Sequence, residues 1–232
     1  MGRPRRQEPR RAHLLAATQR VLERDGLVGL RVREVAAEAE MSPASVLYYY
    51  PDSFQLATLT LGQIAREAAS ERAAIAASIP HPYQRLVALV LHDVADPLPD
   101  IRRAFCEIPS KVVDHPELAA LLEFVLQDQI AVFQAAIEDG VLSGHLPSDV
   151  DARLAARSLV ALLRVTDVCR LAELQTAAAA REHLLAQLDA LVRPRPVPVD
   201  HTGGIARDLG RDRPREAATR PGHPARLDSP RV

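Results

Sequence analysis

The sequence has little of what several common classes of protein need. It contains no Trp, and aromatic residues make up 3% of its 232 residues, so its core must come from Leu, Val, Ile and Ala, a mixture that favours helices. Its two cysteines, Cys106 and Cys169, are too few for a disulfide framework or a four-thiolate metal site. The longest stretch without a charged residue, 53–65, is shorter than the ~20 residues that cross a bilayer. We therefore expect a soluble, cytoplasmic protein with no membrane partner.

Motifs of catalytic sites are also missing. There is no Gly-rich phosphate loop, no GxSxG element and no HExxH element. The eight His are scattered, and none lies four residues from another with a carboxylate partner. We predict that the chain is not an enzyme and that it holds no metal and no cofactor.

Charge is distributed unevenly along the chain. Residues 1–50 contain nine Arg and six acidic residues, whereas residues 51–192 contain 11 basic and 19 acidic residues. Residues 193–232 contain nine Arg against five acidic residues. A basic N-terminal segment on an acidic body suggests that this end meets a polyanion.

Apolar periodicity predicts an all-α fold, because no segment shows sustained alternation with a period of two. Three short helices in 8–52 would form one compact unit behind a basic arm, 1–7. Residues 53–192 would form a larger helical domain, and the Pro-, Gly- and Arg-rich segment 193–232 would be a disordered tail. The helices are expected at 8–24, 31–39, 43–50, 53–79, 83–94, 100–108, 117–139, 148–173 and 176–192.

The second and third short helices have the pattern of a helix-turn-helix. Val35 and Ala36 can pack on Val46 across a short break, and Ser42-Pro43 is a typical start of the next helix. The second helix could then project into a major groove. From spacing alone, an ordinary helical hairpin remains the alternative.

The run from Val32 to Pro51, VREVAAEAEMSPASVLYYYP, resembles the DNA-binding domain of the tetracycline-repressor (TetR) family of bacterial regulators. Asp25-Gly26 before this run and Pro51-Asp52 after it also fit the family. The resemblance implies a TetR-like fold, in which a helical ligand-binding domain forms a homodimer through its last two long helices. It implies a repressor that binds a palindromic operator in double-stranded DNA and is released by a small-molecule inducer.

Three positions depart from the family pattern. Glu40 stands where the family has Gly in the turn, and it would be strained if its φ is positive. Leu47 replaces a Tyr that contacts phosphate, and Ser53 replaces a Lys. These departures motivate the alternative that the chain is an all-helical protein-interaction module whose helix-turn-helix no longer reads DNA.

The expected DNA contacts divide by role, because phosphate contacts position a protein and base contacts specify sequence. Tyr50 is expected in the core of the small domain, and Tyr48 is expected to face the groove. The phosphate contacts are Arg31, Tyr49 and Ser53, the base contacts are Ser45, Leu47 and Tyr48, the shape contacts are Pro43 and Ala44, and the minor-groove contacts are Arg5, Arg6 and Arg10.

The helix at 148–173 is apolar over most of its circumference, which indicates burial on more than one side. A second subunit could cover one side, and complete burial within one chain is the alternative. The expected dimer contacts are Leu159, Leu162, Leu163, Leu184, Leu188 and Leu191.

A ligand pocket would be mostly apolar with a few polar groups. For each candidate residue, an ordinary core position or, for Arg164 and Asp167, a simple pair at i,i+3 is the alternative. The candidates are His92, Phe105, Cys106, Phe124, Gln127, Phe133, Arg164 and Asp167.

Overall fold

The described part of the chain is helical throughout, as predicted. The computed structural model describes residues 7–95 and 99–192, so Arg5 and Arg6 of the predicted arm and the predicted tail lie outside the described residues. Within the described residues there are nine helices and no strand. They are α1 (Gln7–Gly29), α2 (Val32–Glu38), α3 (Pro43–Tyr49), α4 (Ser53–Ser78), α5 (Pro82–Asp93), α6 (Arg102–Lys111), α7 (Glu117–Leu142), α8 (Ala152–Leu171) and α9 (Ala177–Val192).

The turn between α2 and α3 has the geometry of a helix-turn-helix. Glu40 has a φ of 52°, so this residue occupies the left-handed region and is strained, as expected for a residue other than Gly with a positive φ at this position. The N–H of Met41 donates to the carbonyl of Ala36 at 2.8 Å, which closes the turn. Ser42 then caps α3 by accepting from the N–H of Ser45 at 3.1 Å, with Pro43 in the first turn.

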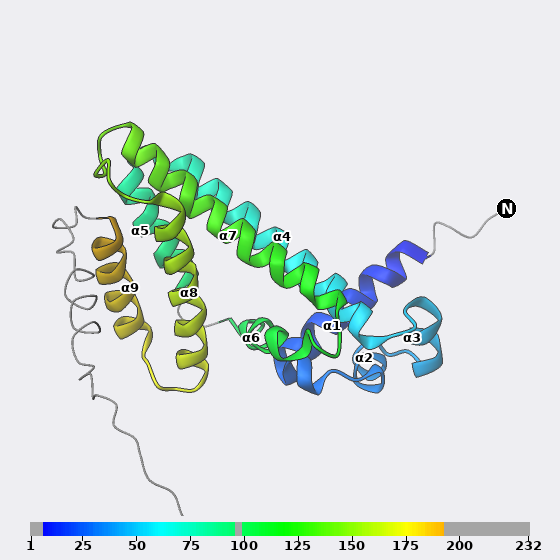
Figure 1. The fold of residues 1–232 in the computed structure, drawn as a ribbon. Coiled ribbons are helices and arrows are strands. Elements are labelled where there is room, and N and C mark those ends of the chain that lie inside the picture. The colour runs from blue at the N-terminus through cyan, green and yellow to red at the C-terminus, as the bar shows by residue number, and fades with distance from the viewer. Residues whose placement is uncertain (1–6, 96–98, 193–232) are drawn as a thin grey trace, which may run out of the picture. The chain divides into compact units, whose positions relative to one another are not determined.

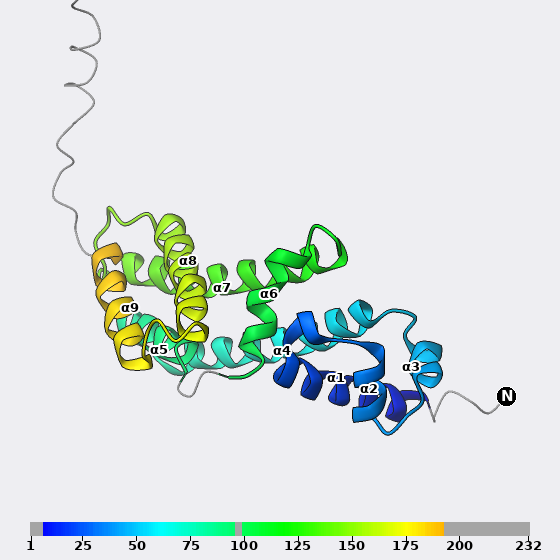
Figure 2. The ribbon, with the colours of Figure 1, turned by 90° about the horizontal axis from the view of Figure 1, so that it is seen from below.

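Two long helices, α4 and α7, lie side by side and connect α1, α2 and α3 to the bundle of α5, α8 and α9 (Figures 1 and 2). Helix α4 begins where Asp52 accepts a hydrogen bond from the N–H of Phe54 at 3.1 Å. Among the described helices, α7 is long and apolar enough to cross a membrane by length and composition. It packs against α4, α5, α6 and α8, so we interpret it as a core helix.

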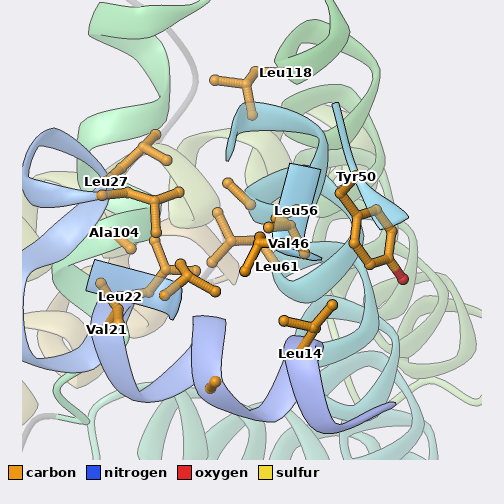
Figure 3. Packing of buried hydrophobic residues seen from close by; sticks show 14 of the residues in the cluster. Leu14, Val21, Leu22, Leu27, Val46, Tyr50, Leu56, Leu61, Ala104 and Leu118 are labelled. Carbon is orange, nitrogen blue, oxygen red and sulfur yellow. The ribbon is translucent and has the colours of Figure 1, made fainter. Parts of the chain in front are cut away.

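The apolar residues form two cores. The first core joins α1 to α4 with α6 and the start of α7, and Figure 3 shows side chains that these helices contribute to it, among them Leu22, Leu56, Ala104 and Leu118. The second core joins α5, the C-terminal half of α7, α8 and α9. Because the first core includes residues of α6 and α7, the small N-terminal unit is packed directly on the larger helical region.

Several helix boundaries differ from the predictions. Helix α1 continues through a kink at Gly26 to Gly29 instead of ending at Arg24, and α6 extends past Pro109 to Lys111 instead of ending at Ile108. Gly140 does not end α7, because the helix continues to Leu142 and a Cβ at Gly140 would lie 2.6 Å from Cδ1 of Leu146. This glycine therefore permits close packing of the following loop rather than helix termination. Helix α8 begins at Ala152, after Asp151 accepts from the N–H of Leu154 at 2.9 Å, and not at Ser148.

Tyr50 and Tyr48 provide a matched test of this packing. Tyr50 is 7% exposed in the first core, as predicted, whereas Tyr48 is 76% exposed. We expect Tyr50→Ala to lower the free energy of unfolding by ~3–5 kcal/mol, because it leaves a cavity. Tyr48→Ala should change it by less than ~0.5 kcal/mol. Urea denaturation followed by circular dichroism measures both, and equal losses would contradict the assigned orientation of α3.

Candidate DNA-binding surface and ligand cavity

Helix α3 exposes one face and buries the other. Val46 is buried in the first core, and Tyr50, immediately after the helix, anchors its C-terminal end. On the opposite face Leu47 and Tyr48 are exposed, and the rings of Tyr48 and Tyr49 meet edge to face with centroids 5.2 Å apart. Pro43 and Ala44 are exposed at the start of the helix. The predicted base and shape contacts therefore lie on an accessible face, with the exception of Ser45.

Ser45 is partly withdrawn from this face. Its side chain is half-buried, and its Oγ lies 2.8 Å from the Oγ of Ser42. Its N–H also donates to that hydroxyl. The Ser45 hydroxyl is thus part of the cap that starts α3.

The predicted phosphate contacts surround α3 in different ways. Arg10, on α1, donates from Nη1 to the hydroxyl of Tyr49 at 3.3 Å, which brings the arm-side end of α1 next to α3. Arg31 precedes α2, and its Nη1 donates to the carbonyls of Val28 at 2.8 Å and Leu30 at 2.9 Å. Ser53 is half-buried as the first residue of α4.

Two arginines of the N-terminal unit have no carboxylate partner. Arg20 and Arg24 form ion pairs with Glu38, at 2.6 and 3.1 Å. Within the described ranges, Arg10 and Arg31 form no ion pair with a carboxylate. The guanidinium group of Arg10, next to Tyr49 of α3, and that of Arg31, before α2, are therefore not neutralised by an ion pair.

A single side chain of α6 holds the end of α1. The carboxylate of Glu107 accepts a hydrogen bond from the N–H of Val28 at 2.9 Å, and Arg103 lies 3.2 Å from its other oxygen. Gly26 makes this approach possible, since its φ is 69° and a Cβ there would lie 2.8 Å from the Glu107 carboxylate. The kink of α1 and the position of α6 thus depend on each other.

A cavity of about 200 Å³ lies between α6, α7 and α8. Its walls are mostly apolar, and Arg164 is the charged residue among them. The lining residues are Phe105, Cys106, Ile108, Pro109, Leu122, Val125, Leu126, Arg164 and Val168. Burial raises the pKa of the Cys106 thiol, so that thiol stays protonated at neutral pH.

Ion pairs adjoin the cavity on the side of α4 and α5. Arg164 and Arg102 share the carboxylate of Asp167, at 3.3 and 3.4 Å. Arg72 pairs with Asp128 at 2.8 Å and with the buried Asp93 at 3.5 Å. Burial raises the pKa of Asp167, an effect that the two guanidinium groups partly offset, and burial lowers the pKa of Arg164.

Several buried polar atoms in this region have no hydrogen-bond partner. Among the described residues they include the Nε atoms of Arg72 and Arg164 and the Oε1 of Gln129. These three residues line a smaller hollow of about 50 Å³ that shares Phe105, Val125 and Arg164 with the main cavity. A buried group without a partner costs about 1–3 kcal/mol, so the region is suited to a polar ligand group or to water.

The structure brings together part of the predicted pocket. Phe105, Cys106 and Arg164 line the cavity, and Asp167 pairs with Arg164. The other four candidates lie elsewhere: Phe133 is buried in the second core, Phe124 and Gln127 are exposed on α7, and His92 lies 3.7 Å from Glu71.

Sequence reasoning missed Arg72, Asp93 and Gln129. The sequence did contain a signal for them, because each of these polar residues lies at a position where the apolar spacing of its helix predicts a buried side chain. Arg72 follows Leu61 by 11 residues on the buried face of α4, which includes Ala65. A charged or amide side chain on such a stripe must be paired inside the protein.

The predicted dimer contacts lie mostly inside one chain. Leu162 and Leu191 are half-buried, while Leu159, Leu163, Leu184 and Leu188 belong to the second core. Helix α8 instead exposes other apolar side chains on one stripe, at i, i+7, i+11 and i+14. They are Leu154, Ala161, Val165 and Val168.

Comparison with known proteins finds the same fold in solved structures of transcriptional regulators. No protein-family model matches the sequence, and no curated protein matches it significantly. Solved structures of similar fold include a TetR transcription regulator from Haloarcula marismortui (22% identity, TM-score 0.72, 80% of this chain and 100% of that chain). Others are a TetR-family regulator from Cytophaga hutchinsonii (14%, 0.69, 80% and 96%) and a transcriptional regulator from Saccharomonospora viridis in complex with choline (21%, 0.73, 80% and 98%). The chain has the fold of TetR-family transcriptional regulators.

The contact between Glu107 and α1 can be tested directly. Glu107→Ala should lower the free energy of unfolding by ~1–2 kcal/mol, because it removes a charged acceptor from a backbone N–H. It should also speed hydrogen exchange at the Val28 amide. Glu107→Gln retains an acceptor oxygen and should preserve most of the protection. Unchanged exchange at Val28 in the alanine variant would show that this hydrogen bond does not hold α1.

Proposed function

We propose that the protein is a ligand-responsive transcriptional repressor that binds DNA as a homodimer in the cytoplasm. The observation that carries this proposal is the exposed face of α3, which is anchored by Val46 and Tyr50 and has Arg10 hydrogen-bonded to Tyr49. Neither Arg10 nor Arg31, before α2, has a carboxylate partner among the described residues. An anchored short helix with such a face suits the major groove.

The accessible side chains divide into positioning and reading groups. The guanidinium groups of Arg10 and Arg31 and the hydroxyl of Tyr49 suit phosphate oxygens. Leu47 and Tyr48 suit base edges and thymine methyl groups. Because few polar side chains lie on this face, part of the specificity would come from the shape of the operator.

The alternative of a protein-interaction module rests on Glu40, Leu47 and Ser53. The strain at Glu40 leaves the turn intact, since the Met41 hydrogen bond and the Ser42 cap are both present. Arg10 and Tyr49 supply phosphate donors near the position where Leu47 stands. Because the turn is intact and Arg10 and Tyr49 can replace the missing phosphate contact, we favour DNA binding over a purely structural role for this helix-turn-helix.

A dimer would use the exposed apolar stripe of α8. Leu154, Val165 and Val168 are large apolar side chains that solvent reaches on one face. Helix α9, which packs beside α8, exposes the small side chains of Ala179, Ala186 and Ala190, which allow close approach of a second subunit. A two-fold pair would present two α3 helices to half-sites one DNA turn apart, ~34–36 Å.

Choline, bound by the regulator from Saccharomonospora viridis, is a poor match for the cavity of this chain. A quaternary ammonium prefers the faces of several aromatic rings. Here Phe105 is the only aromatic residue among the lining residues, and Arg164 adds positive charge. We therefore assign a different ligand class to this protein.

The decisive experiment is selection of bound fragments from genomic DNA. The full-length protein should enrich one palindromic motif, and its affinity for that motif should fall steeply with salt as counterions are released. Recovery of random fragments, or an affinity for DNA that does not change with salt concentration, would favour the alternative of a protein-interaction module.

Two variants separate base reading from phosphate contact. Tyr48→Ala should weaken binding to the selected operator roughly tenfold to a hundredfold more than binding to random DNA, because a base contact contributes about 1–3 kcal/mol of discrimination. Arg10→Ala should weaken binding to both DNAs and flatten the salt dependence. Fluorescence anisotropy at several salt concentrations measures both effects. If both variants weakened binding to operator and random DNA by the same factors, with the same salt dependence, the assignment of Tyr48 to bases and Arg10 to phosphates would be wrong.

The proposed dimer face predicts the behaviour of Val165→Arg. Val165 is 61% exposed in the single chain, and a two-fold interface would contain this substitution twice. An unpaired charge buried at each copy should weaken dimerisation by at least ~tenfold. The control is Leu142→Arg, because Leu142 is 88% exposed at the end of α7. Sedimentation at several concentrations measures both, and a dimer that survives Val165→Arg unchanged would exclude this face.

A further inference from the structure

We propose that the cavity between α6, α7 and α8 binds a small carboxylate with an apolar body, and that Arg164 binds the carboxylate group. This inference deepens the proposed function by naming the chemical class of the inducer. The binding itself requires only the cavity and its charges.

The walls and size of the cavity limit the body of the ligand. Leu122, Val125 and Leu126 of α7 face Phe105 and Ile108 of α6 across the cavity. Its volume of about 200 Å³ is below the ~300–1,000 Å³ of sites for drug-sized molecules. A short alkyl chain or a single aromatic ring would fill it.

The distribution of charge next to the cavity favours an anion at one end. Arg102 and Arg164 both pair with Asp167, so two guanidinium groups share one carboxylate. Asp93 and Asp128 pair with Arg72, so the three arginines and three aspartates balance in number. The Arg102–Arg164 end nevertheless has two guanidinium groups for one carboxylate. A ligand carboxylate would give these two groups a second acceptor.

Arg164 also has an unused donor. Its Nη2 pairs with Asp167, while its buried Nε has no hydrogen-bond partner among the described residues. A carboxylate can accept from the Nε of Arg164 without displacing Asp167, because a guanidinium donates along several edges. Arg164 lines both the main cavity and the smaller hollow, so its position marks the polar end of the site.

The smaller hollow provides a second sign of a polar ligand, from residues other than Arg164. Gln129 is 1% exposed and donates from Nε2 to Asp93 at 2.7 Å, which leaves its Oε1 without a partner. The buried Nε of Arg72 also has no hydrogen-bond partner among the described residues. A bound water or a ligand oxygen next to Arg164 can satisfy these atoms, whereas a purely apolar ligand leaves them unpaired.

The test uses the full-length wild-type protein without DNA and isothermal titration calorimetry. The probes are hexanoate, octanoate and phenylacetate, each compared with its own neutral amide, and choline is the cationic comparison. We expect at least one carboxylate to bind ~10-fold to 100-fold more tightly than its amide, because a charge-assisted hydrogen bond is replaced by a neutral one. Choline should not bind.

Two variants on α8 locate the contact. Arg164→Met keeps an unbranched side chain and should abolish the preference for carboxylate over amide. Arg157→Met is the matched control, because Arg157 is exposed two turns earlier on the same helix, and it should retain the preference. The comparison of carboxylate with amide on the wild-type protein remains decisive if Arg164→Met fails to fold.

The outcomes separate this inference from the proposed function. Equal binding of acids and amides, binding of choline in preference to the acids, or no binding of any carboxylate would overturn the inference. Equal loss in the Arg157 and Arg164 variants would overturn the role of Arg164. Operator selection, performed without ligand, tests DNA binding independently of these results.

Discussion

The position of α6 is the constraint on which the rest of the molecule depends. This helix of ten residues has three different neighbours. Ala104 and Ile108 pack in the first core with the helix-turn-helix, Phe105 lines the cavity, and Glu107 holds the N–H of Val28 at the end of α1. A ligand that shifts α6 by a fraction of an ångström therefore disturbs both the core and the hydrogen bond that hold α1. Close-packed interiors transmit such shifts instead of absorbing them.

The polar residues next to the cavity are better explained by binding than by stability. A buried ion pair recovers little of the free energy that its desolvation costs. Well-packed apolar residues in its place often give a protein that is equally stable. Arg72, Asp93 and Gln129 nevertheless interrupt apolar stripes of α4, α5 and α7, and unpaired atoms remain at Arg72 and Gln129. A protein retains such an arrangement at a cost to stability when a ligand completes it.

The sequence predicted the helices and the orientation of α3 because those depend on local patterns. The Ser42-Pro43 start and the buried Tyr50 follow from capping and periodicity, and both were confirmed. The cavity was less predictable, because it depends on which helices meet. Phe105 and Arg164 were found, but Phe124 has the same residue type as Phe105 and lies exposed on α7. Likewise a helix that is apolar on most sides does not reveal which side its own chain covers, so Leu159 and Leu163 were assigned to an interface although they fill the second core.

The proposed dimer face and the cavity meet at Val168, so the proposed ligand would have two ways to alter DNA binding. Val168 lines the cavity, yet it belongs to the exposed stripe of α8 that a second subunit would cover. A carboxylate bound at Arg164, one turn earlier on α8, would lie between this stripe and Phe105 of α6. Movement of α6 would turn each helix-turn-helix through the Glu107 contact, and movement of α8 would change the angle between subunits. Both changes would alter the distance between the two α3 helices of the proposed dimer. Because half-sites on DNA have a fixed spacing, small displacements at the cavity would release the operator under this proposal.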